Sequence, residues 1–311
     1  MMACIGRSIL PTVNGRKLTV PSNLILIDTE TDGVDPSVNR VIEIGAILFS
    51  VKNACVISAW SELIRPDDVE LNPPTNAAES ANRIAPQALE GGVTYAEAIA
   101  SLQLLSGRAD AAVAHNAVFD HGFLGTVLDP LPWICSMDDI EWPRPGGSQA
   151  LIAIALAHDV GVVQAHRALA DCYILARLLE RVHELRPGCL PAMLARAMRP
   201  KVLYQAMVSF EDKEKAKAVR FRWEPETRRW LRRMAPEDVA DLDFPVRDVE
   251  VYEKKPRIRG ERLGVWVQKV DGAADSDWWQ FCDCAGPFPV SVMVSECLSC
   301  FTRGYQPSRS R

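Results

Sequence analysis

Short apolar runs in the first half of the chain have the length and continuity of β-strands. The run at 24–27 leads into two acidic residues and a turn, and such a run favours a strand that is buried on both faces. Runs at 41–49 and 56–64 follow with short connections, which predicts an antiparallel meander of three strands. Two shorter runs, at 109–114 and 133–137, predict a fourth and a fifth strand.

Apolar residues at helical spacing lie between and after these strands. They predict one helix in pieces and four continuous helices, at residues 76–89, 95–105, 119–128, 149–159 and 168–185. Thr94, with Glu97 three residues later, has the spacing of a capping box at the start of the second of these. Strands first, and then strands alternating with helices, predict an α/β domain with a mixed sheet that ends near residue 188.

The two ends of the chain differ from this domain. Asn14-Gly15 predicts a tight hairpin turn near the N-terminus. Residues 191–199 predict a short helical linker, and the chain then becomes basic and aromatic. We therefore expect four parts, which are an N-terminal arm or hairpin at 1–20, the α/β domain at 21–188, a small basic and aromatic module at 200–255, and a tail with Cys and Trp at 260–311.

Composition narrows the class of protein. The 311 residues carry a formal net charge of -5, so a protein that simply coats DNA is excluded and any contact with nucleic acid must be local. The nine cysteines are scattered and odd in number, which favours a reducing, cytoplasmic compartment over a secreted disulfide framework. We expect no membrane partner, because no apolar run has the length of a bilayer span and no secretory signal pattern opens the chain.

Four acidic residues follow a predicted strand end or lie near a predicted helix start. Asp28 and Glu30 point to the same side of their strand, so their carboxylates repel each other. Asp120 and Asp171 each lie near the start of a helix. Singly, each acid has a structural explanation, as decoration of a strand end or as an acid favoured by a helix dipole. Together they supply the oxygen ligands that Mg²⁺ or Mn²⁺ prefers, in the number that a two-metal phosphoryl-transfer site needs.

A histidine precedes the last of these acids. His166 lies five residues before Asp171, so both side chains can reach one site only if His166 lies in the loop before the helix. Such a histidine is suited to take a proton from water near neutral pH. The structural alternative is an ordinary loop histidine on the surface.

The three motifs resemble those of a known enzyme family. Asp28-Thr29-Glu30, the segment His-Asn-Ala-Val-Phe-Asp at 115–120, and His166 with Asp171 are similar to the three exonuclease motifs of the DEDDh, or DnaQ-like, 3′–5′ exonucleases. The likeness covers roughly residues 22–185 and is greatest to the branch of exonuclease X and the epsilon proofreading subunit of bacterial DNA polymerase III. It implies an α/β, RNase H-like fold, with a mixed five-stranded sheet flanked by helices and small C-terminal modules.

The resemblance also implies a chemistry. Two Mg²⁺ or Mn²⁺ ions would be held by the four acids, and His166 would activate the water that releases a nucleoside 5′-monophosphate. The implied substrate contacts are Thr29, Thr31, His115 and Asn116. We expect single-stranded or 3′-ended DNA as the substrate, with an exoribonuclease of the same fold as the alternative and a non-catalytic nucleic-acid-binding adaptor as a weaker one. No segment of the sequence identifies a polymerase or other protein partner.

The basic module has two interpretations. Residues 213–233 carry nine basic and three acidic residues, a local net charge of +6, which favours contact with nucleic acid. The residues expected to make that contact are Lys213, Lys217, Arg222 and Arg229. In the alternative, the segment is a small solvated helix and hairpin whose core is formed by Phe221, Trp223 and Trp230.

The tail also has two interpretations. Its two cysteine pairs are separated by 12 residues and predict a structural Zn²⁺ site, formed by Cys282, Cys284, Cys297 and Cys300. In the alternative, these are ordinary reduced thiols, and the neighbouring tryptophans form a small hydrophobic cluster.

Overall fold

The protein divides into two compact units, residues 1–249 and 250–311. The structure is a computed structural model that describes residues 12–13, 16–17, 20–66, 75–144, 146–249, 265–268 and 279–282. In the second unit, β12 (Val265–Gln268) pairs antiparallel with β13 (Trp279–Cys282). The side chains of the predicted zinc ligands lie outside the described residues.

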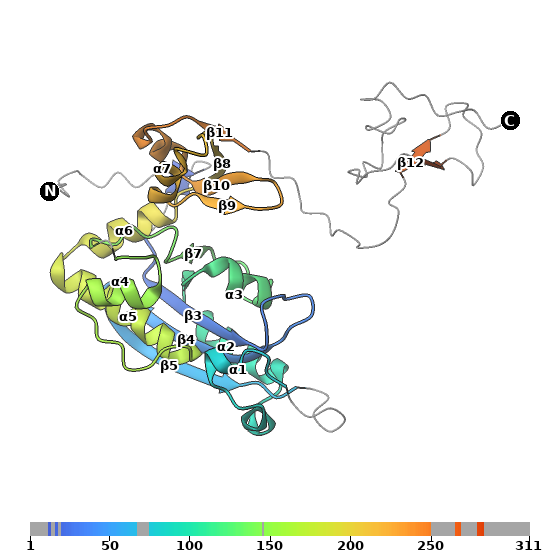
Figure 1. The fold of residues 1–311 in the computed structure, drawn as a ribbon. Helices are drawn as coiled ribbons and strands as arrows, with labels where there is room; N and C mark the ends of the chain where they lie inside the picture. The colour runs from blue at the N-terminus through green and yellow to red at the C-terminus, as the bar shows by residue number, and fades with distance from the viewer. Residues whose placement is uncertain are drawn as a thin grey trace. The chain divides into compact units, whose positions relative to one another are not determined.

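A five-stranded mixed sheet forms the centre of the first unit (Figure 1). Its strands are β3 (Asn23–Thr31), β4 (Val41–Ser50), β5 (Cys55–Leu63), β6 (Ala111–Ala114) and β7 (Trp133–Cys135), in the spatial order β5-β4-β3-β6-β7. β3, β4 and β5 form the predicted antiparallel meander, and β6 and β7 run parallel to β3. The sheet that we predicted is therefore confirmed, and β3 is its middle strand.

Helices cover both faces of this sheet, as the near-continuous burial of β3 and β4 requires. Leu24 and Leu26 face a core shared with α4 (Leu151–Ala157), α5 (Ala168–Leu185) and α6 (Cys189–Ala197). Ile25 and Ile27 face a second core shared with α2 (Tyr95–Ser106) and α3 (Ala117–Leu124). Because side chains alternate along a strand, Asp28 and Glu30 continue the row of Leu24 and Leu26 on the side of α5.

Most predicted elements lie within a few residues of their observed bounds. The observed short elements in this part of the chain are β1 (Thr12–Val13), β2 (Arg16–Lys17), α1 (Glu79–Asn82) and the 3₁₀ helix η1 (Pro86–Gly91). The capping box at Thr94 is present, with Glu97 Oε2 2.9 Å from the Thr94 backbone nitrogen. α3 ends at Leu124 rather than at 128, because Gly125 adopts a positive φ of 55°.

The expected linker helix is part of the α/β core. Leu190, Leu194 and Ala197 of α6 are at most 1 % exposed and belong to the same cluster as α5. The linker interpretation was wrong because a short run rich in Ala and Leu after Pro187-Gly188 also suits a buried helix that packs back onto the domain.

The small module is a sheet of four antiparallel strands with one helix. It contains β8 (Val202–Ala206), α7 (Lys213–Ala218), β9 (Arg222–Glu224), β10 (Arg229–Met234), the 3₁₀ helix η2 (Pro236–Asp241) and β11 (Val246–Asp248), in the strand order β11-β8-β10-β9. Phe221 is buried in its core, but Trp223 is 46 % exposed, so the three-residue core of the alternative interpretation is not what forms. The real core includes Ala206, Ala216 and Met234. None of the described helices has the length and apolar character of a membrane span.

Candidate active site

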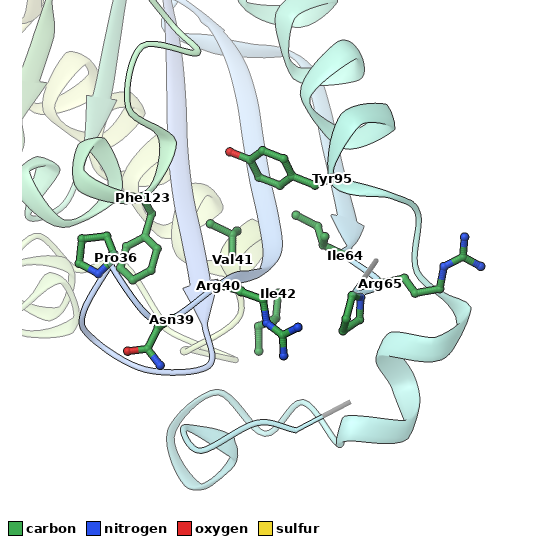
Figure 2. A pocket seen from close by; sticks show the side chains of 10 residues that line it. Pro36, Asn39, Arg40, Val41, Ile42, Ile64, Arg65, Tyr95 and Phe123 are labelled. Atoms are coloured by element: carbon green, nitrogen blue, oxygen red, sulfur yellow. The ribbon is translucent and has the colours of Figure 1, made fainter. Parts of the chain in front are cut away.

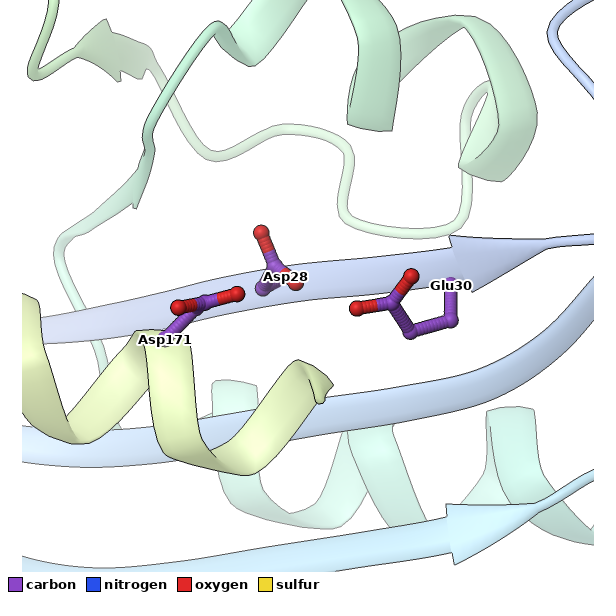
Figure 3. A group of neighbouring side chains, drawn as sticks. All are labelled: Asp28, Glu30 and Asp171. Carbon is purple, nitrogen blue, oxygen red and sulfur yellow. The ribbon is translucent and has the colours of Figure 1, made fainter. Parts of the chain in front are cut away.

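Three carboxylates converge between β3 and α5 (Figure 3). Asp28 and Glu30 project from β3, and Asp171 projects from the first turn of α5. Each offers one oxygen, and these three oxygens lie within 4.8 Å of one another. The structure thus brings together three of the four acids predicted from the sequence.

The start of α5 is fixed by a buried acid on β4. Glu43 is 3 % exposed, and its Oε2 accepts a hydrogen bond from the backbone nitrogen of Ala168, at 3.0 Å. The same carboxylate accepts from Arg167 Nε at 3.0 Å and Nη2 at 2.7 Å, a bidentate ion pair. Glu43 thereby anchors the first residues of α5 against the sheet.

A glycine lets the helix approach closely. A Cβ added to Gly45 would lie 2.3 Å from the backbone nitrogen of Leu169 and 2.4 Å from the carbonyl carbon of Ala168. The backbone of α5 therefore reaches β4 only because position 45 has no side chain. This close approach places Asp171 beside Asp28.

Sequence reasoning missed these supporting residues, although β4 carried two signals. Glu43 is the one charged residue of a strand that is buried along its whole length, and such a charge requires a partner. Gly45 is a glycine in a strand interior, which often marks a close approach of backbone. Arg167 carried no comparable local signal, because its partner lies 124 residues away.

Asp120 reaches the site from α3, on the other side of β3. Its Oδ1 accepts from the Thr29 backbone nitrogen at 2.9 Å and from Thr29 Oγ1 at 2.8 Å. Asp120 is 2 % exposed and lies outside the group of three carboxylates. Asn116, with a φ of 74°, begins α3 through a left-handed turn that directs the helix toward β3. The Thr29 hydroxyl, which we expected to contact substrate, instead holds Asp120.

Burial raises the pKa of every acid in the site, and repulsion by the other acids raises it further for Asp28 and Glu30. Burial is the largest cause for Asp28, whose pKa lies well above its usual value, and the neighbouring Asp120 and Asp171 raise it further. Burial and Asp171 raise the pKa of Glu30 to about 7. The pKa of Asp120 is also raised to about 7, by burial and against the two hydrogen bonds from Thr29. Burial raises the pKa of Asp171 against the hydrogen bond from the His166 backbone.

His166 lies in the loop before α5, where the sequence placed it. Its φ of 62° is left-handed, and its backbone nitrogen donates to Asp171 Oδ2 at 3.0 Å. The residue is exposed. The hydrogen bond ties the loop that carries the imidazole to one of the three carboxylates.

Two other predicted substrate contacts have structural roles. The ring nitrogens of His115 lie 2.9 Å from Ser136 Oγ and 2.9 Å from the Gln149 carbonyl oxygen, so the ring is already bonded within the domain. Thr31 Oγ1 donates to the Gly33 carbonyl oxygen at 2.5 Å. Substrate contact by these two side chains stays a prediction, and in the structure their polar atoms bond to protein groups.

The predicted contacts of the module lie on α7 and on the β9–β10 hairpin. Lys213 Nζ lies 3.6 Å from the ring centroid of Phe210, and Lys217 Nζ lies 2.7 Å from Glu214 Oε1. Arg222 Nη2 donates to Asp138 Oδ1 of the α/β domain at 2.8 Å. Arg229 is exposed on β10.

A separate pocket of about 260 Å³ lies beside the β3–β4 connection and the start of β4 (Figure 2). Its walls include Val41 at the start of β4, Ile64 after β5, Tyr95 of α2 and Phe123 of α3. None of the four acids lines it.

The donor set fits a hard divalent cation. Carboxylate oxygens are the ligands that Mg²⁺ and Mn²⁺ prefer, and zinc sites typically include sulfur or nitrogen ligands. The raised pKa values also indicate a cation site, because three acids this close are stable as anions only beside a positive charge. The residues present therefore suit the metal that the sequence predicted.

Comparison with known proteins agrees with this geometry. The exonuclease family profile matches residues 25–129, and the DNA polymerase III subunit epsilon of Treponema pallidum is 32% identical over 161 residues, which cover 49% of this chain and 72% of that subunit. The chain belongs to this exonuclease family. The predicted DEDDh resemblance and RNase H-like fold are thereby confirmed.

Other relatives each match about half of this exonuclease-family chain. Exodeoxyribonuclease 10 of Escherichia coli K12 is 31% identical over 161 residues, which cover 50% of this chain and 66% of that enzyme. The DNA polymerase III PolC-type of Thermotoga maritima is 26% identical over 178 residues, which cover 53% of this chain but only 12% of that polymerase. A solved structure of exonuclease X in complex with 5′ overhanging duplex DNA has 27% identity and a TM-score of 0.43, covering 56% of this chain and 99% of that one. Residues 202–249 match a separate family, described as a domain of unknown function.

Proposed function

We propose that this protein is a 3′–5′ exonuclease that removes nucleotides one at a time from the 3′ end of DNA and releases nucleoside 5′-monophosphates. The observation that carries the proposal is the convergence of Asp28, Glu30 and Asp171 within 4.8 Å, in a chain of the exonuclease family. A protein that only binds nucleic acid gains nothing from buried acids that repel one another and repel phosphate.

The carboxylates are the proposed metal ligands. Asp28, Glu30 and Asp171 would hold one Mg²⁺ or Mn²⁺, and Asp28 with Asp120 would hold a second. Ions bound there neutralise the charge of the phosphodiester and lower the pKa of water. The protein contributes fixed ligand positions, because β3 is buried on both faces and α5 is anchored through Glu43.

His166 is the proposed general base. Its imidazole takes the proton of the water that attacks the last phosphodiester. The bond from phosphorus to the 3′ oxygen breaks, and that oxygen stays on the shortened strand and takes a proton from solvent. The hydrogen bond from its backbone nitrogen to Asp171 keeps the loop beside the carboxylates. Exposure of the residue allows the accepted proton to pass to solvent.

DNA is the proposed substrate because two relatives that match half of this chain are named an exodeoxyribonuclease and a subunit of a DNA polymerase. The carboxylate chemistry alone acts equally on RNA. The test is a panel of single-stranded DNA and RNA oligonucleotides of matched sequence, labelled at the 5′ end, with Mg²⁺, Mn²⁺ or EDTA. We expect stepwise shortening of DNA from the 3′ end with either metal, and none with EDTA. Faster shortening of RNA, or cleavage within the strand, would contradict the proposal.

A further inference from the structure

A row of aromatic rings and lysines crosses the helical side of the small module. Phe210 precedes α7, Lys213 and Lys217 lie on α7, and Trp230 and Trp223 lie on β10 and β9. We call these five residues the aromatic–lysine row. Lys213 Nζ lies 3.6 Å from the Phe210 centroid, Lys217 Nζ lies 5.8 Å from the Trp230 centroid, and the two tryptophan rings are 5.5 Å apart.

The geometry of the helix and sheet makes the row continuous. Lys213 and Lys217 are four residues apart on α7, so they share one face of the helix. Trp230 and Trp223 are directly paired across the β10–β9 ladder, so their side chains share one face of the sheet. The rings are also accessible, because Phe210 is 77 % exposed and Trp223 is 46 % exposed.

Exposed rings beside cations have a specific use. Contact between an exposed aromatic ring and water is unfavourable, and a binding partner that covers the ring removes it. A contiguous group of such rings therefore marks a binding site. Nucleobases offer flat faces that stack on such rings, and the lysines offer charge to the adjoining phosphates. The local net charge of +6 over residues 213–233 complements the negative charge of a nucleic-acid backbone.

The module is attached at the edge of the sheet where β3 carries its acids. Arg220 donates to the carbonyl oxygens of Met137 and Ile140 at 3.1 and 3.3 Å, and Arg222 pairs with Asp138. These three acceptors directly follow β7, whose last residue is paired with the last residue of β6. β6 and β7 run parallel to β3, so their ends lie at the edge of the sheet where β3 carries its acids.

We propose that the aromatic–lysine row stacks the unpaired bases of a single-stranded nucleic acid whose 3′ end lies in the candidate active site. The inference rests on the proposed function for the polarity of the strand. It assigns to the module the role of holding the single-stranded region upstream of the nucleotide being removed.

Binding is measured on the full chain, separately from cleavage. The probe is a fluorescent oligo(dT) of about 20 nucleotides, long enough to span a single-strand site, and the buffer contains EDTA. We expect Trp223→Ala and Phe210→Ala each to raise the Kd by roughly ten-fold, the scale of one lost base stack. Trp223→Tyr keeps a ring and should bind almost as the parent chain does. Both truncated side chains are exposed, so the variants should fold, and circular dichroism checks this.

The matched control is a pair of lysines on one helix. Lys217 is paired with Glu214 and Lys215 with Asp212, both at three-residue spacing, but only Lys217 lies over a ring. Lys217→Ala should weaken binding several-fold, and Lys215→Ala should change it little.

The outcomes separate the two proposals. Unchanged affinity in both Trp223→Ala and Phe210→Ala would contradict base stacking on the row. Equal losses of affinity in Lys215→Ala and Lys217→Ala would also contradict it, because they would show that charge alone accounts for binding. An equal loss for blunt duplex DNA would also overturn it, because paired bases cannot stack on the row. If the parent chain binds the oligonucleotide through the row but fails to shorten it with Mg²⁺, the proposed function fails and the row stands.

Discussion

At the scale of single residues, the acids of the site are held in an environment that disfavours their charged forms. Asp120 is buried, and Asp28 and Glu30 are partly buried beside further acids. The folded chain without metal therefore carries electrostatic strain that the unfolded chain does not. A bound divalent cation removes this strain, so metal binding should also stabilise the fold.

This strain predicts a pH dependence for the metal-free protein. The pKa values of Glu30 and Asp120 are about 7 in the folded chain and near 4 when unfolded, so the folded state binds more protons between these values. The contribution of Glu30 and Asp120 to the free energy of unfolding is therefore greatest at and below about pH 4–5. It falls as the pH rises through 7. We expect the Tm in EDTA to fall by several degrees from pH 5 to 8, and Mg²⁺ to reduce that fall.

The control for this prediction compares two neutralised glutamates. Glu30→Gln should raise the Tm in EDTA at pH 8, because it removes one repelling charge, and Glu90→Gln, on the exposed surface, should not. A Tm in EDTA that is flat between pH 5 and 8 would contradict the electrostatic account.

Two histidines allow a second test at this scale. His166→Ala should lower kcat by about two to four orders of magnitude, the usual contribution of a positioned base, with little change in Tm. His115→Ala should instead lower the Tm, because it removes the bonds to Ser136 and Gln149. Steady-state rates and thermal unfolding of both variants distinguish the roles, and an unchanged kcat in His166→Ala would remove it from the mechanism.

At the scale of elements, the site depends on how α5 meets β4. Gly45→Ala should push the start of α5 away from the sheet, because the new Cβ would lie 2.3 Å from the backbone of Leu169. We expect a loss of about 1–3 kcal/mol in stability and a fall in activity beyond the loss of folded protein. Gly91→Ala is the matched control, since a Cβ there meets nothing within 4 Å. Activity in Gly45→Ala equal to that in Gly91→Ala would show that Asp171 does not depend on this contact.

The elements also show what the sequence could predict. β3 and α5 were predicted nearly to the residue, because an apolar run ending in acids and a strongly amphipathic helix are local patterns. The acids of the site were found for the same reason. Glu43 and Arg167 were missed because their bond joins residues 124 positions apart, and α6 was misassigned because burial against α5 is decided by tertiary packing.

At the scale of the whole molecule, ion pairs attach the small module to the α/β domain. Arg199 pairs with Asp238 at 2.6 Å, Lys201 with Asp139 at 2.9 Å, and Arg222 with Asp138 at 2.8 Å. Each such pair contributes about 0–1 kcal/mol, so several together are needed to fix an orientation. The sequence revealed the charge of the module, but its four-stranded sheet was missed because β9 and β11 have only three residues each.

The C-terminal unit carries the prediction about zinc. The four tail cysteines predict one bound Zn²⁺ per chain of 311 residues, and a chain that ends at Val249 should contain none. The shortened chain keeps the whole first unit, so its Mg²⁺-dependent activity should remain. Metal analysis of both proteins after dialysis tests this. A chain of 311 residues without zinc would favour the alternative of reduced thiols.

The most direct test of the central claim is the release of 5′-mononucleotides from a 3′ end by Asp28→Asn and Asp171→Asn, measured against the parent chain with Mg²⁺. Both variants keep the shape of the side chain and remove one ligand charge from the group of three carboxylates. We predict that both lose Mg²⁺-dependent release while their Tm in EDTA stays equal to or above that of the parent, and that Glu90→Gln releases nucleotides at the parent rate. Near-parent release by either aspartate variant would contradict the assignment of these carboxylates as the catalytic metal site.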